Sequence, residues 1–236
     1  MTRKLLLPDP RTGAFGEYAP PGLCETGFTD RTSQAILNHI VGKTAMYALP
    51  QAFVALFTAV GTDAGTGFTE VSGGGYARAT TAGADWNAAS GSAPSTISNA
   101  NPVTFPMASS AWNNIIAFGI YDALTAGNLQ CWDYFGNFPW RPTTVGIGTP
   151  ALFTQPAHGY LAGDQLVWTL EYGGVAPAGA TLTGLLSVAS PTADTYNVGQ
   201  NTTGTGDGQM RKVLSQTVQS GLQPIFAPGS FVVSSA

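Results

Sequence analysis

The clearest helical pattern in the chain lies between residues 29 and 42. Apolar side chains recur there at helical spacing along one stripe, at Ala35, Ile36, Leu37, Ile40 and Val41. Thr29 or Asp30 can cap the N-terminus, and Gly42 supplies a stop because glycine readily adopts the left-handed conformation that follows many helices. The pattern predicts one amphipathic helix, with His39 as a polar residue at its rim.

Beyond the helix, the apolar pattern changes to short runs that are typical of strands. Residues 53–58 are apolar on both faces, which is typical of a buried strand. Further short runs predict strands at 69–71, 76–79, 103–105, 115–121, 129–132, 165–170, 185–188, 195–198, 213–218 and 231–233. The chain also contains 30 glycines and 16 prolines, and this density of turn formers favours many short strands over long helices.

The same patterns divide the chain into segments. Residues 1–28 carry four prolines and four glycines without helical or strand periodicity, which predicts an extended N-terminal arm. A boundary falls near Arg141 and Pro142. Beyond it, strands and turns up to residue 198 predict a small β unit, and residues 199–208 predict a flexible exit from it.

Charged residues make up only 9% of the 236 residues, against about 25% in typical soluble domains. The formal net charge of −4 leaves no basic surface for phosphates, so binding to nucleic acid is not expected. Two long segments contain no charge, namely those between Asp85 and Asp122 and after Lys212. A neutral surface is desolvated cheaply, because buried charge is the costly element of an interface. The composition therefore favours repeated contacts between subunits.

The N-terminal sequence does not predict an export segment. Three leucines follow Arg3 and Lys4, but Pro8 ends this apolar run well short of the roughly 7–15 residues that a signal peptide needs. No apolar run approaches the ~20 residues of a membrane span, so we expect a protein that is made in a cytoplasm and stays soluble. The two cysteines, Cys24 and Cys131, predict buried or partly buried thiols, and whether they pair is left open.

No motif predicts a catalytic, cofactor-binding or metal site. The tripeptide at 42–44 is similar to the end of a phosphate-binding loop, but Leu37 occupies the position where that motif needs glycine. His39 and His158 are the only histidines, and neither lies beside an obvious orienting carboxylate. Asp207 lies in a glycine-rich turn that could contact calcium, although a plain polar turn is the simpler interpretation. We expect no cofactor and no enzymatic activity.

Carbohydrate chemistry is the remaining alternative. Thirteen acidic residues could meet in space as a carboxylate pair, although their spacing does not call for one. Five tryptophans could stack on sugars, although such residues in β proteins mostly lie in the core; they are Trp86, Trp112, Trp132, Trp140 and Trp168.

Several strings along the chain resemble a structural family of tailed bacteriophages whose members are labelled tail fibre proteins. The most specific string runs from Thr69 to Arg78 and reads TEVSGGGYAR. Others support it in order and spacing: 30–42, 53–58, 62–65, Ser98-Asn99, 103–106, 111–122, 127–129 and 226–233. Residues 156–198 are similar to a second module associated with phages, the small FCCH-like β domain, through AHG at 157–159, AGD at 162–164 and PTADTY at 191–196.

The resemblance implies a mainly β protein. We expect an antiparallel, jelly-roll-like β-sandwich formed by residues 29–140 and 209–236, with one N-terminal helix. The family pattern would continue directly from the region of Trp132 to the closing strands, so residues 141–208 are expected to be an inserted FCCH-like module. The arm 1–28 lies outside the family pattern.

The implied function is that of a structural virion component, most readily a tail or fibre protein that self-associates as a homo-oligomer and docks on tail, collar or capsid proteins. A head decoration or collar protein clamped by the N-terminal arm is the second possibility. A carbohydrate-binding or depolymerase protein that contacts a host surface glycan is the third.

Overall fold

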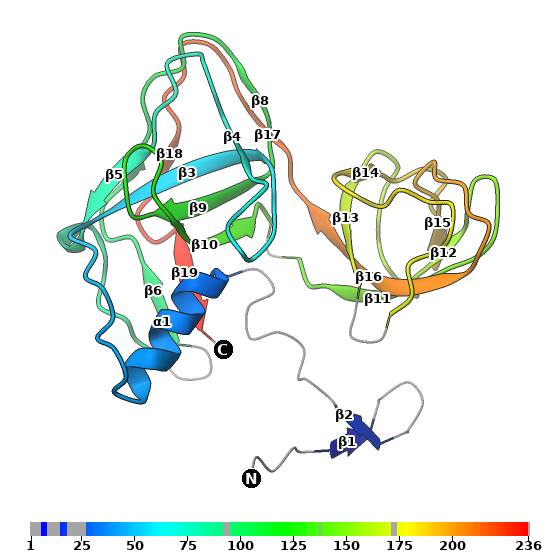
Figure 1. Ribbon diagram of the computed structural model, residues 1–236. Coiled ribbons are helices and arrows are strands. Elements are labelled where there is room, and N and C mark those ends of the chain that lie inside the picture. The colour runs from blue at the N-terminus through cyan, green and yellow to red at the C-terminus, as the bar shows by residue number, and fades with distance from the viewer. Residues whose placement is uncertain are drawn as a thin grey trace.

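The computed structural model describes residues 27–91, 95–136, 138–170 and 174–235, together with the backbone of two short strands nearer the N-terminus. The fold is mainly β, with 38% of residues in strands and 7% helical, and every strand pairing is antiparallel. This confirms the fold class expected from the sequence. Figure 1 shows two β bodies, one containing strands β3–β10 and β17–β19, the other containing β11–β16.

The first body is a β-sandwich built around strand β3 (Gln51–Ala59), whose central residues are buried on both faces. Its main sheet has the order β10-β9-β3-β4, formed by β10 (Leu129–Tyr134), β9 (Ala117–Tyr121) and β4 (Thr69–Glu70). Strand β5 (Ala79–Ala82) also pairs with β3. The 3-10 turn η1 (Gly83–Asp85) follows β5. The expected buried strand at 53–58 is thus confirmed.

Three two-stranded pairs complete the sandwich, and each joins the C-terminal segment to an earlier strand. Strand β17 (Gln216–Val218) pairs with β8 (Trp112–Ile115), β18 (Ile225–Phe226) with β7 (Val103–Thr104), and β19 (Val232–Ser235) with β6 (Ser95–Ser98). The chain therefore returns along its own earlier path in reverse order. Aromatic rings fill the space between these strands, with Phe231 against Phe118, Phe226 and Trp86.

The second body is one six-stranded sheet with the order β14-β13-β16-β11-β12-β15. Its strands are β11 (Arg141–Val145), β12 (Phe153–Thr154), β13 (Gln165–Thr169), β14 (Leu186–Ser187), β15 (Thr195–Tyr196) and β16 (Gly206–Val213). Beyond the ends of β14 and β15, Ala189 and Asn197 exchange two backbone hydrogen bonds of 2.8 and 3.0 Å. These bonds close the sheet into a small barrel around a core that includes Phe153, Leu166, Tyr196 and Met210.

The expected end of the inserted segment, between residues 208 and 209, falls inside β16. This strand pairs along its length with β11 and β13, so its residues up to Val213 lie in the barrel sheet. Val213, together with Val167, also packs in a cluster with residues of β3, β9 and β10. The two bodies therefore share an apolar contact at their junction.

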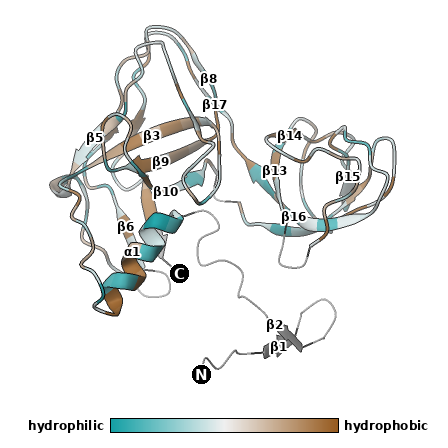
Figure 2. Ribbon diagram, viewed as in Figure 1, coloured by the Kyte–Doolittle hydropathy of each residue, from teal (hydrophilic) through white to brown (hydrophobic). Residues whose placement is uncertain are grey.

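The helix α1 (Asp30–Ile40) has the expected bounds, with Thr29 as N-cap residue and a positive φ of 71° at Gly42. Its packing is the unexpected feature. The only buried residue of α1 is Thr32, and the apolar residues near its C-terminus are exposed. Figure 2 shows this exposed apolar end as a brown segment of the helix.

Most of the expected arm, residues 1–28, lies outside the described residues, as does Cys24. Within it, the backbone of β1 (Leu6–Pro8) pairs with β2 (Phe15–Glu17). From Gly27 the chain runs along β10, where Phe28 forms a bridge with Cys131 and the Trp132 amide donates to the Gly27 carbonyl at 2.8 Å. Cys131 itself lies in the sandwich core.

Candidate functional site

The segment 69–78 holds a largely buried ion pair between Glu70 and Arg78. Arg78 Nη2 lies 2.7 Å from Glu70 Oε2, and Arg78 Nε lies 3.0 Å from Glu70 Oε1. The side chain of Arg78 is only 7% exposed. Its Nη1 donates to the carbonyl oxygens of Ala123 and Ala126, both at 2.7 Å, and its guanidinium lies 3.5 Å from the centre of the Tyr121 ring. Arg78 thus ties the start of β5 to β4, to the end of β9 and to the loop after it.

Tyr76 completes this cluster. Its hydroxyl donates to Glu70 Oε1 at 2.8 Å and accepts a hydrogen bond from the Leu56 amide at 3.0 Å. Burial raises the pKa of Tyr76 far above its usual value, which keeps the phenol protonated and able to donate. Because the ion pair and the phenol are engaged by groups of the same chain, the cluster serves to join segments of the sandwich.

The three glycines at 73–75 let the backbone of this segment approach Trp112 closely. The carbonyl of Gly74 accepts a 2.9 Å hydrogen bond from Trp112 Nε1, and Gly74 has a φ of +58°. A Cβ atom there would lie 2.7 Å from Trp112 Nε1, which is closer than real Cβ contacts. Tyr76 packs edge-on against the same indole. The string that carried the phage resemblance therefore encodes a structural joint.

The two histidines lie in different bodies and have structural partners. His39 Nδ1, at the end of α1, accepts a hydrogen bond from the Met46 amide at 3.3 Å. His158 is buried in the barrel, where its Nδ1 accepts from the Tyr160 amide at 2.9 Å and its ring stacks on that of Tyr160. Among the described residues, no three His, Cys, Asp or Glu side chains gather in a way that could hold a metal ion.

The tripeptide at 42–44 and the five tryptophans also have structural roles. The tripeptide at 42–44 follows the C-terminus of α1, whereas a phosphate loop precedes a helix. None of the five tryptophans, all of which lie in the described part of the chain, is an exposed residue. Trp168, for example, packs edge-on against Phe153 at 6.3 Å between ring centroids. The prediction that these tryptophans belong mostly to the core is thus confirmed, because Trp112 and Trp132 are buried and the other three pack against the core clusters.

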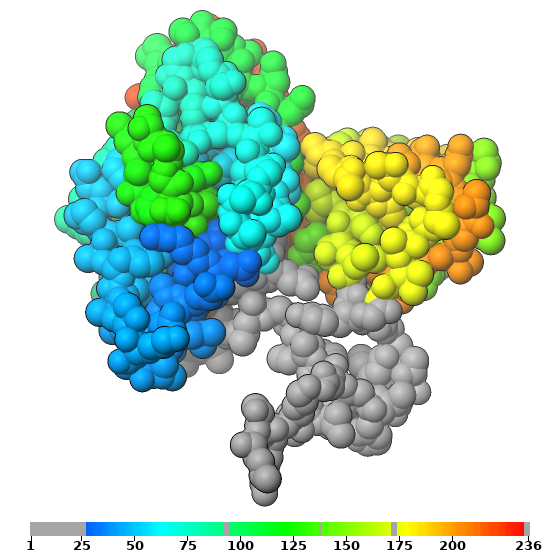
Figure 3. All heavy atoms as spheres, viewed as in Figure 1, coloured from blue at the N-terminus to red at the C-terminus, as the bar shows by residue number. Residues whose placement is uncertain are grey.

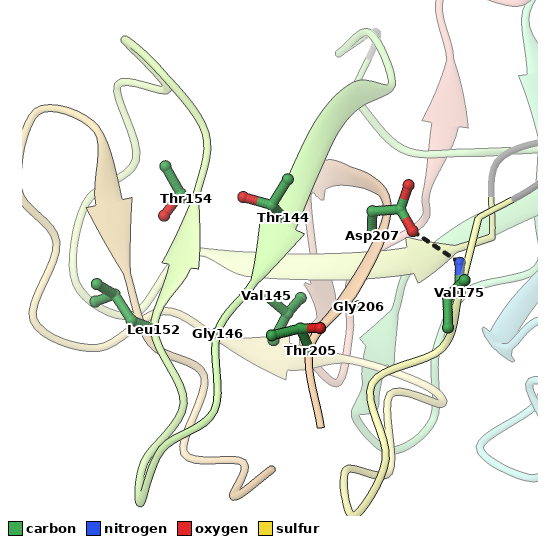
Figure 4. Close-up of a pocket in the computed structure, with 9 residues that line it drawn as sticks. All are labelled: Thr144, Val145, Gly146, Leu152, Thr154, Val175, Thr205, Gly206 and Asp207. Carbon is green, nitrogen blue, oxygen red and sulfur yellow. Dashed lines mark hydrogen bonds between the residues drawn. The ribbon is translucent and has the colours of Figure 1, made fainter. Parts of the chain in front are cut away.

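The barrel carries an open groove of about 560 Å³ on its outer side (Figure 4). Strand register places Thr144 opposite both Thr154 and Asp207, so two hydroxyls and a carboxylate form a row across three strands. Asp207 Oδ1 accepts a hydrogen bond from the Val175 amide at 2.8 Å. Val175 and Leu152 supply exposed apolar surface beside this row. The sequence pattern predicts a turn at Asp207, with a calcium contact as the alternative, because the pairing between β11 and β16 joins residues far apart in the chain.

Comparison with known families supports the phage resemblance for part of the chain. Residues 27–137 match a family described as podophage GP4 fiber I protein gp80. The match begins just before α1 and ends just after β10, so it spans the sandwich up to the point where the barrel begins. No curated protein matches the chain. The likeness of residues 156–198 to an FCCH-like module stays a prediction.

No helix in the described part of the chain is long and apolar enough to cross a membrane. The family match covers just under half of the sequence. Together with the mainly β fold, this similarity supports a fibre-type structural protein of a bacteriophage.

Proposed function

We propose that the chain is a tail or fibre component of a bacteriophage virion that self-associates and docks on other virion proteins. The observation that carries this proposal is the match of residues 27–137 to a phage fibre family. The matched residues include Glu70, Tyr76 and Arg78, which form the joint of the sandwich. The matched range thus includes the residues that join these segments of the sandwich.

The low charge of the chain supports a role in assembly. With 9% charged residues, many contacts with other subunits form without the cost of burying ions. Glu70 and Arg78 pair with each other within the chain. Their burial is therefore explained by the structure of the sandwich, without a bound substrate. The absence of catalytic activity stays a prediction.

Copy number per purified particle tests this function. Quantitative mass spectrometry against the major capsid protein should give a count far below that of the capsid protein, as expected for a tail, collar or fibre protein. A count close to that of the capsid protein would instead indicate head decoration. Absence of the chain from purified particles would remove the virion proposal.

The N-terminal arm is the proposed docking element. Removal of residues 1–26 leaves Gly27 and Phe28 in place on β10, so the sandwich should still fold. We expect particles assembled with this truncated chain to lack it, while its circular dichroism spectrum and melting temperature match those of the full chain. Normal incorporation would show that the arm does not dock the protein.

Contact with a host glycan is a second candidate, favoured by the row of Thr154, Thr144 and Asp207 in the barrel groove. Hydroxyls and a carboxylate are suitable partners for sugar hydroxyls. Glycan-array binding by the full chain, lost in the double variant Thr144→Val and Thr154→Val, would support this candidate. Binding that is absent or unchanged by the two substitutions would remove the groove from consideration.

A further inference from the structure

Helix α1 is attached to the sandwich through its polar side. Thr32 Oγ1 donates to Gln130 Oε1 at 3.1 Å, and Arg31 Nη1 lies 3.4 Å from the same oxygen. The hydroxyl of Tyr47, which follows the helix, also donates to this oxygen. The buried amide of Gln130 on β10 is thus the centre of the attachment, and its own Nε2 donates to the Asn128 carbonyl at 2.7 Å.

The N-terminus of the helix is held in the same polar manner. Thr29 Oγ1 donates to the Leu129 carbonyl at 2.8 Å, and the Asp30 amide donates to the Asp63 carbonyl at 2.8 Å. Arg31 also reaches Asp122 Oδ2 at 3.3 Å. Hydrogen bonds therefore hold α1 in a fixed rotation about its axis, with Leu37 and Ile40 left exposed.

The apolar side of the helix faces outward. Leu37, Ile40 and Val41 are 64%, 71% and 75% exposed, and their spacing of three and four places them on one helical face. Met46 and Leu49, in the segment after the helix, add further exposed apolar surface. We call these five residues the α1 patch. An amphipathic helix normally turns such a face toward its own core, so this reversed arrangement indicates a surface that is covered in an assembly.

We propose that the α1 patch binds the same patch of a second copy of this chain. The inference rests on the self-association in the proposed function and identifies its surface. In a contact around a twofold axis two identical patches meet, so a patch that carries a large net charge would repel its own copy. From Thr32 to Pro50 the only Lys, Arg, Asp or Glu is Lys43, which makes this segment compatible with itself.

The neutrality of the patch also argues against a charged partner as occupant, because it offers no opposite charges to pair. In Figures 1 and 3 the C-terminal end of α1 lies at the lower left of the sandwich, whereas the barrel lies to the right of the sandwich, so the barrel does not cover this end of the helix.

Sedimentation velocity of the full chain from about 1 to 100 μM tests this surface. We expect concentration-dependent dimers, and Ile40→Glu should raise the dimer dissociation constant roughly tenfold or more, because it buries an unpaired charge. The matched control is Ile147→Glu, which replaces an equally large and similarly exposed residue of the barrel, 65% exposed. This control should dimerise as the native chain does.

Both substitutions are at exposed positions, so the two variants should keep the native melting temperature and circular dichroism spectrum. A native chain that stays monomeric throughout, or an Ile40→Glu variant that dimerises normally, would overturn the proposal. Loss of dimers on removal of residues 1–26, with normal dimers in Ile40→Glu, would identify the arm as the contact and would also overturn it. Each of these results is distinct from failure of the virion proposal, which is judged by copy number in particles.

Discussion

Arg211 Nη1 lies 2.9 Å from Asp133 Oδ1, and this ion pair joins β16 of the barrel to β10 of the sandwich. Arg211 Nη2 also donates to the Gly136 carbonyl at 3.1 Å. The side chain of Arg211 is 4% exposed and that of Asp133 is 37% exposed. A buried cation thus meets a partly hydrated anion at the junction of the two bodies.

We expect Asp133→Asn to lower the free energy of unfolding by about 2 kcal/mol, below the full cost of breaking a buried pair because water screens Asp133. Calorimetry should also show the two bodies melting less cooperatively. Lys212→Gln is the control, because Lys212 pairs with Asp164 within the barrel and not across the junction. This variant should melt in a single transition, as the native chain does. Identical melting curves for Asp133→Asn and the native chain would contradict this role of the junction.

The Glu70–Arg78 pair is expected to contribute more. Glu70→Gln leaves the guanidinium of Arg78 buried without its counter-ion and weakens the acceptor of the Tyr76 hydroxyl. We expect a loss of about 3 kcal/mol, measured by urea unfolding. Arg31→Gln serves as the comparison, because Arg31 is 43% exposed and its pair with Asp122 should contribute less than about 1 kcal/mol. Equal losses in the two variants would show that burial of the pair is unimportant.

Substitution of two adjacent glycines distinguishes the cost of backbone strain from the cost of a steric clash. Gly73 and Gly74 both have positive φ, but a Cβ at Gly73 meets nothing within 4 Å, whereas one at Gly74 meets Trp112 and Ser110 below 3.0 Å. We expect Gly73→Ala to cost about 1 kcal/mol of stability and Gly74→Ala about 2 kcal/mol more. Thermal unfolding of both variants measures the difference. A Gly74→Ala variant as stable as Gly73→Ala would mean that Trp112 moves aside without cost.

Alkaline pH should destabilise the fold through buried phenols. Burial raises the pKa of Tyr76, Tyr134 and Tyr196 well above the usual value of about 10. Above pH ~10 the unfolded chain releases these protons while the folded chain keeps them, so the free energy of unfolding falls as pH rises, by about 1.4 kcal/mol per pH unit for each tyrosine.

Urea unfolding at a series of pH values from about 9 to 11 measures this slope. The variant Tyr196→Phe should show a smaller slope than the native chain, because one titrating group is removed from the barrel core. A slope that is zero in the native chain would contradict protonated, buried phenols in the folded state.

Much of the sandwich could be predicted from local sequence, because burial and turn chemistry are both local signals. The apolar run at 53–58 gave β3, and the caps at Thr29 and Gly42 gave the bounds of α1. The orientation of α1 could not be predicted in this way. Periodicity identifies an apolar face but not its surroundings, and the residue that turns this helix, Gln130, lies 98 positions from its partner Thr32.

The residue at which the barrel ends could not be predicted for a similar reason. Residues 206–213 read as a glycine-rich exit followed by two charges, yet they form the longest strand of the barrel. Arg211 interrupts the apolar pattern expected of a buried strand. The strand tolerates this charge because Asp133, 78 positions away, compensates it. Gly208 fits because Trp168 occupies the space where a Cβ would lie. Both features depend on distant partners that the local pattern does not contain.

The barrel begins and ends at one place on the sandwich. Its first and last strands, β11 and β16, are neighbours in one ladder, with Arg141 opposite Met210. Seen from the sandwich, the whole barrel is therefore equivalent to a long hairpin, because its first and last strands lie side by side. The long segment between β10 and β17 therefore leaves β17–β19 in place to pair with β8–β6 in reverse order.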